Sequence, residues 1–273
     1  MSFALIDAKK ADVPVETACA VLNVSVSGFY AWKNRPASRR QTDDMVLLAH
    51  IRAEFATSNE TYGSPRMHLK ARQKTRFKRT TDSDHGGPVA KNVLDQDFTA
   101  DAPDQKWGVD ISYVWTTEGW LYLAIVLDLY SRKIVGWSMS DRMKKGWAME
   151  ALRRAIILRQ PPPGLIHHSD RGSQYCADDY RRILRDRGFV ASMSGRGNCY
   201  DNAMVETVFK TIKSELVWRT SFASRAEAAK EIGQYIEGFY NPRRRHSSLG
   251  YISPAAFEAR LPATTRQKRM ALH

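Results

Sequence analysis

The order of the apolar stretches between residues 106 and 216 limits the possible folds more than any other feature of the sequence. Three stretches rich in β-branched and aromatic residues follow one another across short turns, and each predicts a strand: Lys106–Trp115, Gly119–Leu129 and Lys133–Met139. Predicted helices then alternate with two short predicted strands. The helices cover Met143–Arg159, Tyr180–Asp186 and about Tyr200–Leu216, and the strands cover Leu165–His168 and Phe189–Met193. This order predicts an α/β domain, with a sheet covered by helices.

Three strands, helix, strand, helix, strand, helix is the element order of the ribonuclease H-like α/β fold, which we predict for residues 101–260. The 273 residues leave room for small appendages. Val15–Lys33 predicts two short helices with Ser25 as the N-cap of the second, typical of a small N-terminal all-α helix-turn-helix region. A helical hairpin without a DNA role fits that segment equally well. We predict a helical DNA-binding region at 1–58, a basic linker at 59–100 and a basic tail at 261–273.

The charge balance indicates a polyanionic partner. Forty-two Lys and Arg face 29 Asp and Glu, which gives a net charge of +13 and a pI near 9.7. Such a chain usually acts on nucleic acid, although a basic surface without that role stays possible. The three cysteines match no zinc-ligand spacing, and their odd number argues against a disulfide framework. With no signal peptide and no apolar run of membrane-spanning length, we expect a cytoplasmic protein without a membrane partner.

Three carboxylates occupy positions at which the predicted fold could bring them together. Asp110 lies within the first strand, Asp170 directly follows the fourth, and Glu206 lies in the last helix, with 35 residues between Asp170 and Glu206. Ligand sites of α/β sheets favour the carboxyl ends of strands. Three converging carboxylates would repel one another and raise their own pKa values. Two hard divalent ions about 3.5–4 Å apart resolve that conflict and suit in-line displacement at phosphorus.

Basic residues near these carboxylates are candidate DNA contacts. Lys210 and Lys213 lie four and seven positions beyond Glu206, so all three share one helix face. We interpret both lysines as phosphate ligands, with surface ion pairs as the alternative. Arg171 could contact a phosphate or pair with a carboxylate.

Four further residues complete the predicted DNA contacts: Asn202, Arg243, Arg244 and Arg245. For Asn202 the alternative is a helix cap, and for the arginines it is a solvated face. We interpret His167 and His168 as structural, because hard ions prefer oxygen ligands, and Asp128 as a residue of local structure.

Several long motifs resemble a known family. HSDRGSQY, SMSGRGNCYDNAMVETVFKTIKSEL and YIEGFYNPRRRHSSLGYISPAAFE are similar to bacterial insertion-sequence transposases of the retroviral-integrase type. The resemblance is closest to the downstream-frame product of two-frame elements. It extends from about Asp104 to Glu258, and it is weaker through the N-terminal helices and the run ETYGSPRMH.

This resemblance implies an integrase-like catalytic core whose D-D-E triad is Asp110, Asp170 and Glu206. Lys213 matches the basic residue that the family carries seven positions beyond its glutamate. The resemblance also implies two Mg²⁺ ions, with Mn²⁺ as a substitute, and cleavage at element ends followed by joining of the freed 3′-hydroxyl to another strand. The expected partners are DNA (the terminal inverted repeats and the target), further copies of the chain and an upstream-frame transposition protein, with the enzyme associated with the nucleoid.

One departure from the family pattern leaves two alternatives open. After ETYGSPRMH the chain passes almost at once into a run of basic residues between Arg66 and Arg79, so about thirty residues of a helical DNA-binding segment are expected to be missing. A chain shortened there could be a defective copy that binds DNA without transposing. The third possibility is a nuclease of the ribonuclease H type, which the family-like stretch after Glu206 disfavours.

Overall fold

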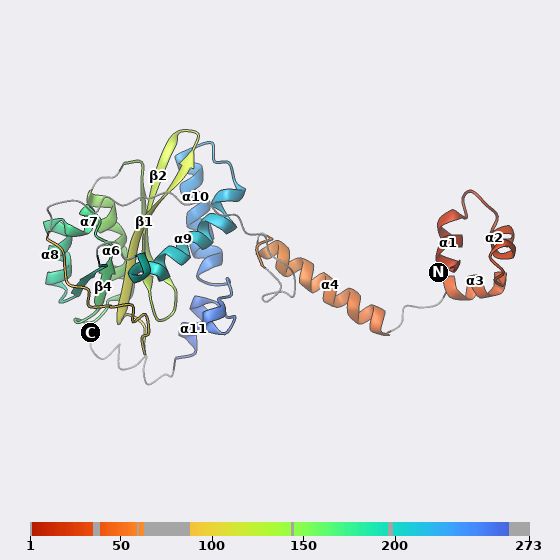
Figure 1. Cartoon of the computed structure of the whole chain (residues 1–273), viewed down its shortest axis with the longest axis horizontal. Helices are drawn as coiled ribbons and strands as arrows, with labels where there is room; N and C mark the ends of the chain where they lie inside the picture. The colour runs from red at the N-terminus through yellow and green to blue at the C-terminus, as the bar shows by residue number, and fades with distance from the viewer. Residues whose placement is uncertain are drawn as a thin grey trace. The chain divides into compact units, whose positions relative to one another are not determined.

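The computed structural model describes residues 2–34, 39–58, 60–62, 88–142, 145–195 and 199–261. Contacts divide the chain into two compact units, 1–56 and 57–273, which we describe separately (Figure 1). The boundaries proposed after residues 58, 100 and 260 remain predictions. The basic run Arg66–Arg79 lies outside the described residues, as does nearly all of the basic tail. Within the described ranges, no helix has both the length and the apolar character that a membrane crossing needs.

The N-terminal unit consists of helices. They are α1 (Ser2–Lys9), α2 (Val15–Val21), α3 (Val26–Lys33) and α4 (Arg39–Thr57). Ser25 caps α3 as predicted, because its Oγ accepts a hydrogen bond from the Gly28 amide at 3.0 Å. Ile6, Cys19 and Phe29 are fully buried and bring α1, α2 and α3 around one small core. The two predicted helices of this region are therefore confirmed as elements, whereas their DNA role stays a prediction.

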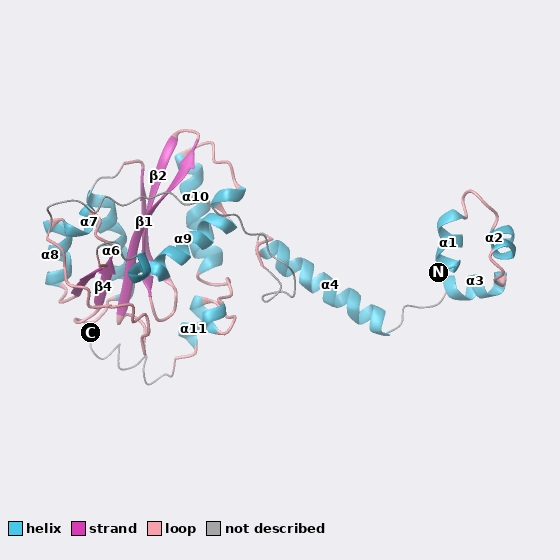
Figure 2. Ribbon diagram, in the orientation of Figure 1, coloured by secondary structure: helices cyan, strands magenta, loops and turns pink. Residues whose placement is uncertain are grey.

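The second unit is built on a mixed five-stranded sheet (Figure 2). Its strands are β1 (Lys106–Thr116), β2 (Gly119–Asp128), β3 (Ile134–Ser140), β4 (Ile166–Ser169) and β5 (Val190–Met193). The strand order is β3-β2-β1-β4-β5. The first three strands pair antiparallel, and β4 and β5 add to the β1 edge in parallel. All five strands that the sequence predicts are thus present in the predicted order.

β1 extends well beyond its parallel neighbour. It pairs with β2 over residues 107–116 but with β4 only over residues 106–109. From Asp110 onward, β1 therefore has a paired strand on its β2 side alone, among the strands that the structure describes. Among the described strands, the edge of β1 that faces β4 is therefore unpaired from Asp110 onward, and Asp110 is the first residue of the candidate site.

Helices cover both faces of the sheet (Figure 1). They are α6 (Lys145–Arg159), α7 (Ser173–Cys176), α8 (Asp178–Asp186), α9 (Ala203–Glu215), α10 (Arg225–Gln234) and α11 (Pro254–Ala259). Shorter turns join them: η1 (Cys199–Asn202), η2 (Val217–Arg219), the π-helical η3 (Tyr235–Tyr240) and η4 (Ser247–Leu249). Buried side chains of α6, α7 and α8 form one core with Trp107 and Val109 of β1. On the other face, α9 packs against Gly108.

Gly136 sets the distance between β3 and α6. A Cβ at this position would lie 2.3 Å from the backbone oxygen of Ala151 and 2.7 Å from the Ala155 Cβ. We expect Gly136→Ala to lower the free energy of unfolding by about 1–3 kcal/mol, the usual cost of overpacking a core. Gly146 is the matched control, because a Cβ added there meets nothing within 4 Å. Gly146→Ala should stabilise by about 0.4–1 kcal/mol in denaturant unfolding, and equal effects of the two substitutions would contradict the packing argument.

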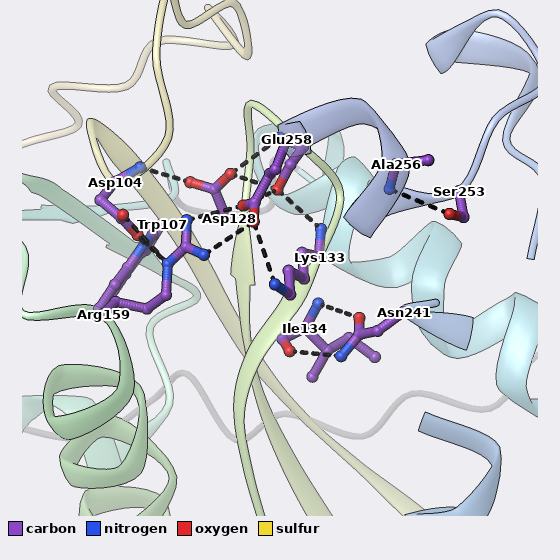
Figure 3. Close-up of polar contacts among 11 residues, drawn as sticks. Asp104, Trp107, Asp128, Lys133, Ile134, Arg159, Asn241, Ser253, Ala256 and Glu258 are labelled. Atoms are coloured by element: carbon purple, nitrogen blue, oxygen red, sulfur yellow. Dashed lines mark hydrogen bonds and ion pairs between the residues drawn. The ribbon is translucent and has the colours of Figure 1, made fainter. Parts of the chain in front are cut away.

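A network of ion pairs and hydrogen bonds holds α11 against the end of the sheet that lies opposite the β1–β2 turn (Figure 3). The Arg159 guanidinium donates to Asp104 at 2.9 Å and to both oxygens of Glu258 at 2.9 and 2.7 Å. Asp128 accepts hydrogen bonds from the backbone amides of Asp104 and Ser131 at 2.8 and 2.9 Å. The interpretation of Asp128 as a residue of local structure is therefore confirmed.

Candidate active site

The sheet register brings Asp110 and Asp170 side by side. Val109 and Ser169 form the last pair between β1 and β4, and the two aspartates are the next residue of each strand. Asp110 Oδ1 accepts a hydrogen bond from the Ile111 amide at 2.7 Å. Asp170 Oδ1 accepts one from the amide of Gly172 at 2.9 Å. The carboxylates of Asp110 and Asp170 therefore lie close together where β4 ends.

The electrostatics of Asp110 reflect this proximity. Although part of the residue reaches the surface, burial of its carboxyl raises the pKa of Asp110 well above the usual range, and the Asp170 charge raises it further. The Ile111 amide and the Lys213 cation act in the opposite direction but do not reverse the shift. Burial and the neighbouring carboxylates therefore disfavour the ionised form of Asp110.

Glu206 approaches the pair from α9. It lies in the first turn of the helix rather than a turn and a half into it, because residues 199–202 form the separate turn η1. The neighbouring Val205 packs so closely on β1 that a Cβ on Gly108 would lie 2.6 Å from its Cγ2. Glu206 also raises the pKa of Asp110, less than Asp170 does. Its Oε2 lies 4.0 Å from Lys210 Nζ.

The donor set of this site fits hard divalent ions. Carboxylate oxygens are the ligands that Mg²⁺ prefers, and a cation would relieve the repulsion that raises the pKa of Asp110. In the part of the chain that the structure describes, no three acidic, histidine or cysteine side chains already converge into a cage for one ion. Mg²⁺ is often held by one or two carboxylates together with waters, so Asp110 and Asp170 could hold an ion without a third protein ligand.

Lys213 links the carboxylates to the β1–β2 hairpin. Burial lowers the pKa of its ammonium, and the Asp110 charge raises it. Its Nζ lies 5.1 Å from the centre of the Tyr113 ring, within the range of a cation–π contact. The side chain thus interacts at once with the carboxylates and with an aromatic residue three positions beyond Asp110.

Two of the predicted DNA contacts are wrong. Asn202 is 5% exposed, and its Nδ2 donates to the Val109 carbonyl oxygen at 3.4 Å, which ties the start of α9 to β1. It precedes α9 without a side-chain cap bond. Arg244 is 4% exposed, and its guanidinium pairs with both oxygens of Glu215 at 2.8 and 2.6 Å. Neither side chain is available to a phosphate.

The other predicted DNA contacts reach the surface to different degrees. Lys210 has 63% of its side chain exposed. Arg243 is exposed, whereas Arg245 and Arg171 are partly exposed. Arg171 Nε donates to the Ser194 carbonyl oxygen at 2.8 Å, so its guanidinium is held near the end of β5. Binding of DNA by these four residues stays a prediction.

Two histidines support the site from within the sheet. Burial lowers the pKa of His167 to about 3 and that of His168 to about 4, so both are neutral near pH 7. His167 Nε2 lies 3.0 Å from the Tyr180 hydroxyl, and His168 Nδ1 lies 2.9 Å from the Ser192 hydroxyl. The structural interpretation of both residues is confirmed.

Sequence reasoning considered Asp201 as a cap of the catalytic helix and missed the tertiary contacts through which it holds η1. Asp201 is fully buried, and its Oδ2 accepts hydrogen bonds from the Gly195 amide at 2.7 Å and from Asn92 Nδ2 at 3.1 Å. Asn92 is 109 residues away in the chain, so no local pattern could have indicated this contact. The segment before β1 thereby helps to fix the helix that carries Glu206.

Comparisons with known proteins agree with this geometry. Residues 100–199 match the protein family Integrase core domain, and residues 187–254 match a second family of the same description. A simian T-cell lymphotropic virus intasome, solved in complex with the PP2A regulatory subunit B56 gamma, contains a chain that aligns with a TM-score of 0.51. That alignment has 15% identity and covers 67% of this chain and 63% of the other. The fold and site thus define an integrase catalytic core, and the ribonuclease H-like fold class is confirmed.

Relatives that align over most of their length identify a more specific family within the proteins that contain an integrase catalytic core. The uncharacterized 31 kDa protein of insertion element IS600 from Shigella sonnei is 45% identical, over 88% of this chain and 96% of that protein. Transposase InsF for insertion sequence IS3A from Escherichia coli (strain K12) is 38% identical, over 94% and 98% respectively. The chain belongs to this family of insertion-sequence transposases of the integrase type.

Proposed function

We propose that this transposase cleaves DNA strands at the ends of its insertion sequence and joins the freed 3′-hydroxyl to a second strand. Asp110, Asp170 and Glu206 are its catalytic carboxylates. The observation that carries the proposal is the pairing of Asp110 and Asp170 at the end of β4, beneath the helix that bears Glu206. Because burial and the neighbouring carboxylates raise the pKa of Asp110, its ionised form costs stability, and a bound cation would offset that cost.

We further infer that the three carboxylates hold two Mg²⁺ ions, which Mn²⁺ can replace. Such ions supply charge that stabilises the attacking and leaving oxygens of an in-line displacement at phosphorus. The chain itself orients the carboxylates: the Ile111 and Gly172 amides fix the two aspartates, and the packing of Val205 on Gly108 fixes the start of α9. Closure of Glu206 on the aspartates would complete the ligand set.

The DNA backbone in this proposal follows the basic residues around the site. Lys210 and Lys213 extend along α9 from Glu206, and Arg171 follows Asp170 directly. Arg243 and Arg245, the chain neighbours of the buried Arg244, add two further cations. Contacts of this kind position DNA without reading its sequence. A net charge of +13 supports such phosphate-dominated binding.

Assembly and end recognition involve further copies of the chain and a second protein. Element ends must be held in pairs, so we propose that the chain acts as a homo-oligomer on nucleoid DNA, aided by an upstream-frame transposition protein. A defective copy that only binds DNA is the second candidate. It is favoured by the alignment with the Escherichia coli transposase, which extends over 288 positions and is therefore longer than this chain of 273 residues.

A strand-transfer assay tests the proposed function. Labelled duplexes that carry the inverted repeats flanking the gene are incubated with the full chain and Mg²⁺, beside a labelled RNA–DNA hybrid. We expect joined products from the element ends and no cleavage of the hybrid. DNA binding without joined products, also after addition of the upstream-frame protein, would identify a defective copy. Hybrid cleavage alone would identify a ribonuclease H-type nuclease.

A further inference from the structure

An exposed aromatic cluster lies on the β1–β2 hairpin beyond the candidate active site. Tyr113 pairs with Tyr122 across the hairpin, and Trp115 pairs with Trp120, so the four rings lie on one face. Ile111 and Tyr122 still pack against the core beneath α6. The rings nearer the hairpin turn leave this core, with 59% of Trp115 and 43% of Trp120 exposed. Tryptophan is highly buried on average, so this exposure is unusual.

The rings of this aromatic hairpin, defined as Tyr113, Trp115 and Trp120, form a single unit. Trp120 lies 4.9 Å from Tyr113 and 4.8 Å from Trp115, and both contacts are edge-to-face. Such contacts stabilise the arrangement. These contacts also leave part of the ring surface accessible to solvent, in agreement with the exposure of Trp115. The hairpin thus presents a preformed aromatic surface rather than isolated side chains.

The position of the aromatic hairpin connects it with catalysis. Tyr113 lies three residues beyond Asp110 on β1, a separation of roughly 10 Å at the usual strand rise, and by strand alternation its side chain leaves the sheet on the face opposite to that of Asp110. That length corresponds to about three nucleotides at the 3.4 Å spacing of stacked DNA. The β4 side of β1 carries no paired strand here among the described residues, and Lys213 reaches from α9 to the Tyr113 ring. A strand that leaves the carboxylates would cross this open edge of β1, where Lys213 lies, and would then reach the exposed rings on the other face.

We propose that the aromatic hairpin is a stacking surface for unpaired bases of the DNA strand next to the reacting phosphate. This inference rests on the proposed function and deepens it. Paired duplex DNA offers phosphates and groove edges at its surface, for which cations suffice. Unpaired bases expose their π-faces and stack on aromatic side chains with little dependence on sequence. Lys213 beside Tyr113 supplies the neighbouring phosphate contact, so rings and cation together match a single strand.

Binding measurements on the full-length chain test this inference. Fluorescence anisotropy in EDTA, at one fixed salt concentration, would compare a labelled oligothymidine single strand with a mixed-sequence duplex. We expect Trp115→Ala to weaken single-strand binding about tenfold or more, as the loss of one stacked base predicts. Duplex binding should change by less than about twofold. Trp115→Phe should retain most of the single-strand affinity, because it keeps an aromatic face.

Tyr251→Ala is the matched control. Tyr251 is 44% exposed and precedes α11, at the end of the sheet remote from the hairpin turn (Figure 1), and its loss should change neither affinity. Thermal unfolding by circular dichroism would establish that the variants are folded. If folded Trp115→Ala bound the single strand as tightly as the unmodified chain, the inference would be overturned. A changed sedimentation coefficient with unchanged single-strand affinity would overturn it too and identify an interface between copies. Failure of the unmodified chain to bind even the duplex would instead contradict the proposed function.

Discussion

Asp110→Asn, Asp170→Asn and Glu206→Gln are each expected to abolish strand cleavage and joining, with rates falling by at least about 10³-fold. Each change preserves the shape of the side chain but removes the charge that a divalent ion needs. The two aspartates lie next to each other at the end of β4, so each variant removes one charged ligand from the same site. Single-turnover joining of labelled element ends in Mg²⁺ would measure the loss.

Two further measurements distinguish lost ligation from lost folding. DNA binding in EDTA should stay within about twofold of the unmodified chain. The melting temperature of Asp110→Asn in EDTA should rise near neutral pH, because burial and the Asp170 charge raise the pKa of Asp110, and a group of that kind destabilises the fold when it is ionised. Asp178→Asn is the control, since 94% of that side chain on α8 is exposed. Near-normal joining by any of the three variants would remove that residue from the catalytic set.

The elements of the catalytic domain could be predicted where the apolar pattern was local. Strands β1, β2 and β3 combine β-branched and aromatic residues between turn signals, β4 and β5 are short stretches, and the structure shows all five. Helix α1 was missed although Phe3 and Ile6 are three residues apart, as on one helix face, and both pack in the small N-terminal core. The helix formed by α10 and η3 was missed although Ile232, Ile236 and Phe239 repeat at helical intervals and are buried. The helical pattern is therefore present in the sequence, although no helix was predicted there.

The sequence was sufficient to predict which residues form the candidate site. It was not sufficient to predict whether each side chain points into the protein or to the surface. Asp110 lies within β1 and Asp170 directly follows β4, and the parallel pairing of these two strands, which follows from the element order, brings the two residues together. By contrast, a sequence of three arginines reveals charge and not burial. Arg243 is exposed and Arg244 is buried, because the chain that follows η3 turns one guanidinium inward to Glu215. Such a contact, 29 residues apart in the chain, depends on tertiary packing.

The ion pair between Arg244 and Glu215 allows the effect of burial on an arginine to be tested separately from the effect of its charge. Its partners have 5% and 7% of their side chains exposed, with 2.6 Å between Arg244 NH2 and Glu215 Oε1. The Tyr235 hydroxyl donates a third hydrogen bond to Glu215 at 2.6 Å. Removing one member of a buried pair leaves the other charge without compensation, which costs about 3–5 kcal/mol. The pair joins the end of α9 to the segment after η3, so its loss would affect the helix that carries Glu206.

Arg244→Met should therefore lower the free energy of unfolding by about 3–5 kcal/mol and the melting temperature by roughly 10 °C. Replacing both partners, as Arg244→Met with Glu215→Leu, should recover much of the loss, because no buried charge then remains. Arg243→Met is the matched control one residue away. That arginine is exposed, so its loss should change stability by less than about 0.5 kcal/mol. If Arg243 contacts a phosphate, the same variant should reduce the slope of log affinity against log salt by about one unit. Urea unfolding and DNA titrations at several salt concentrations would measure both effects. Equal stability losses for the two single variants would show that the burial of Arg244 does not determine its role.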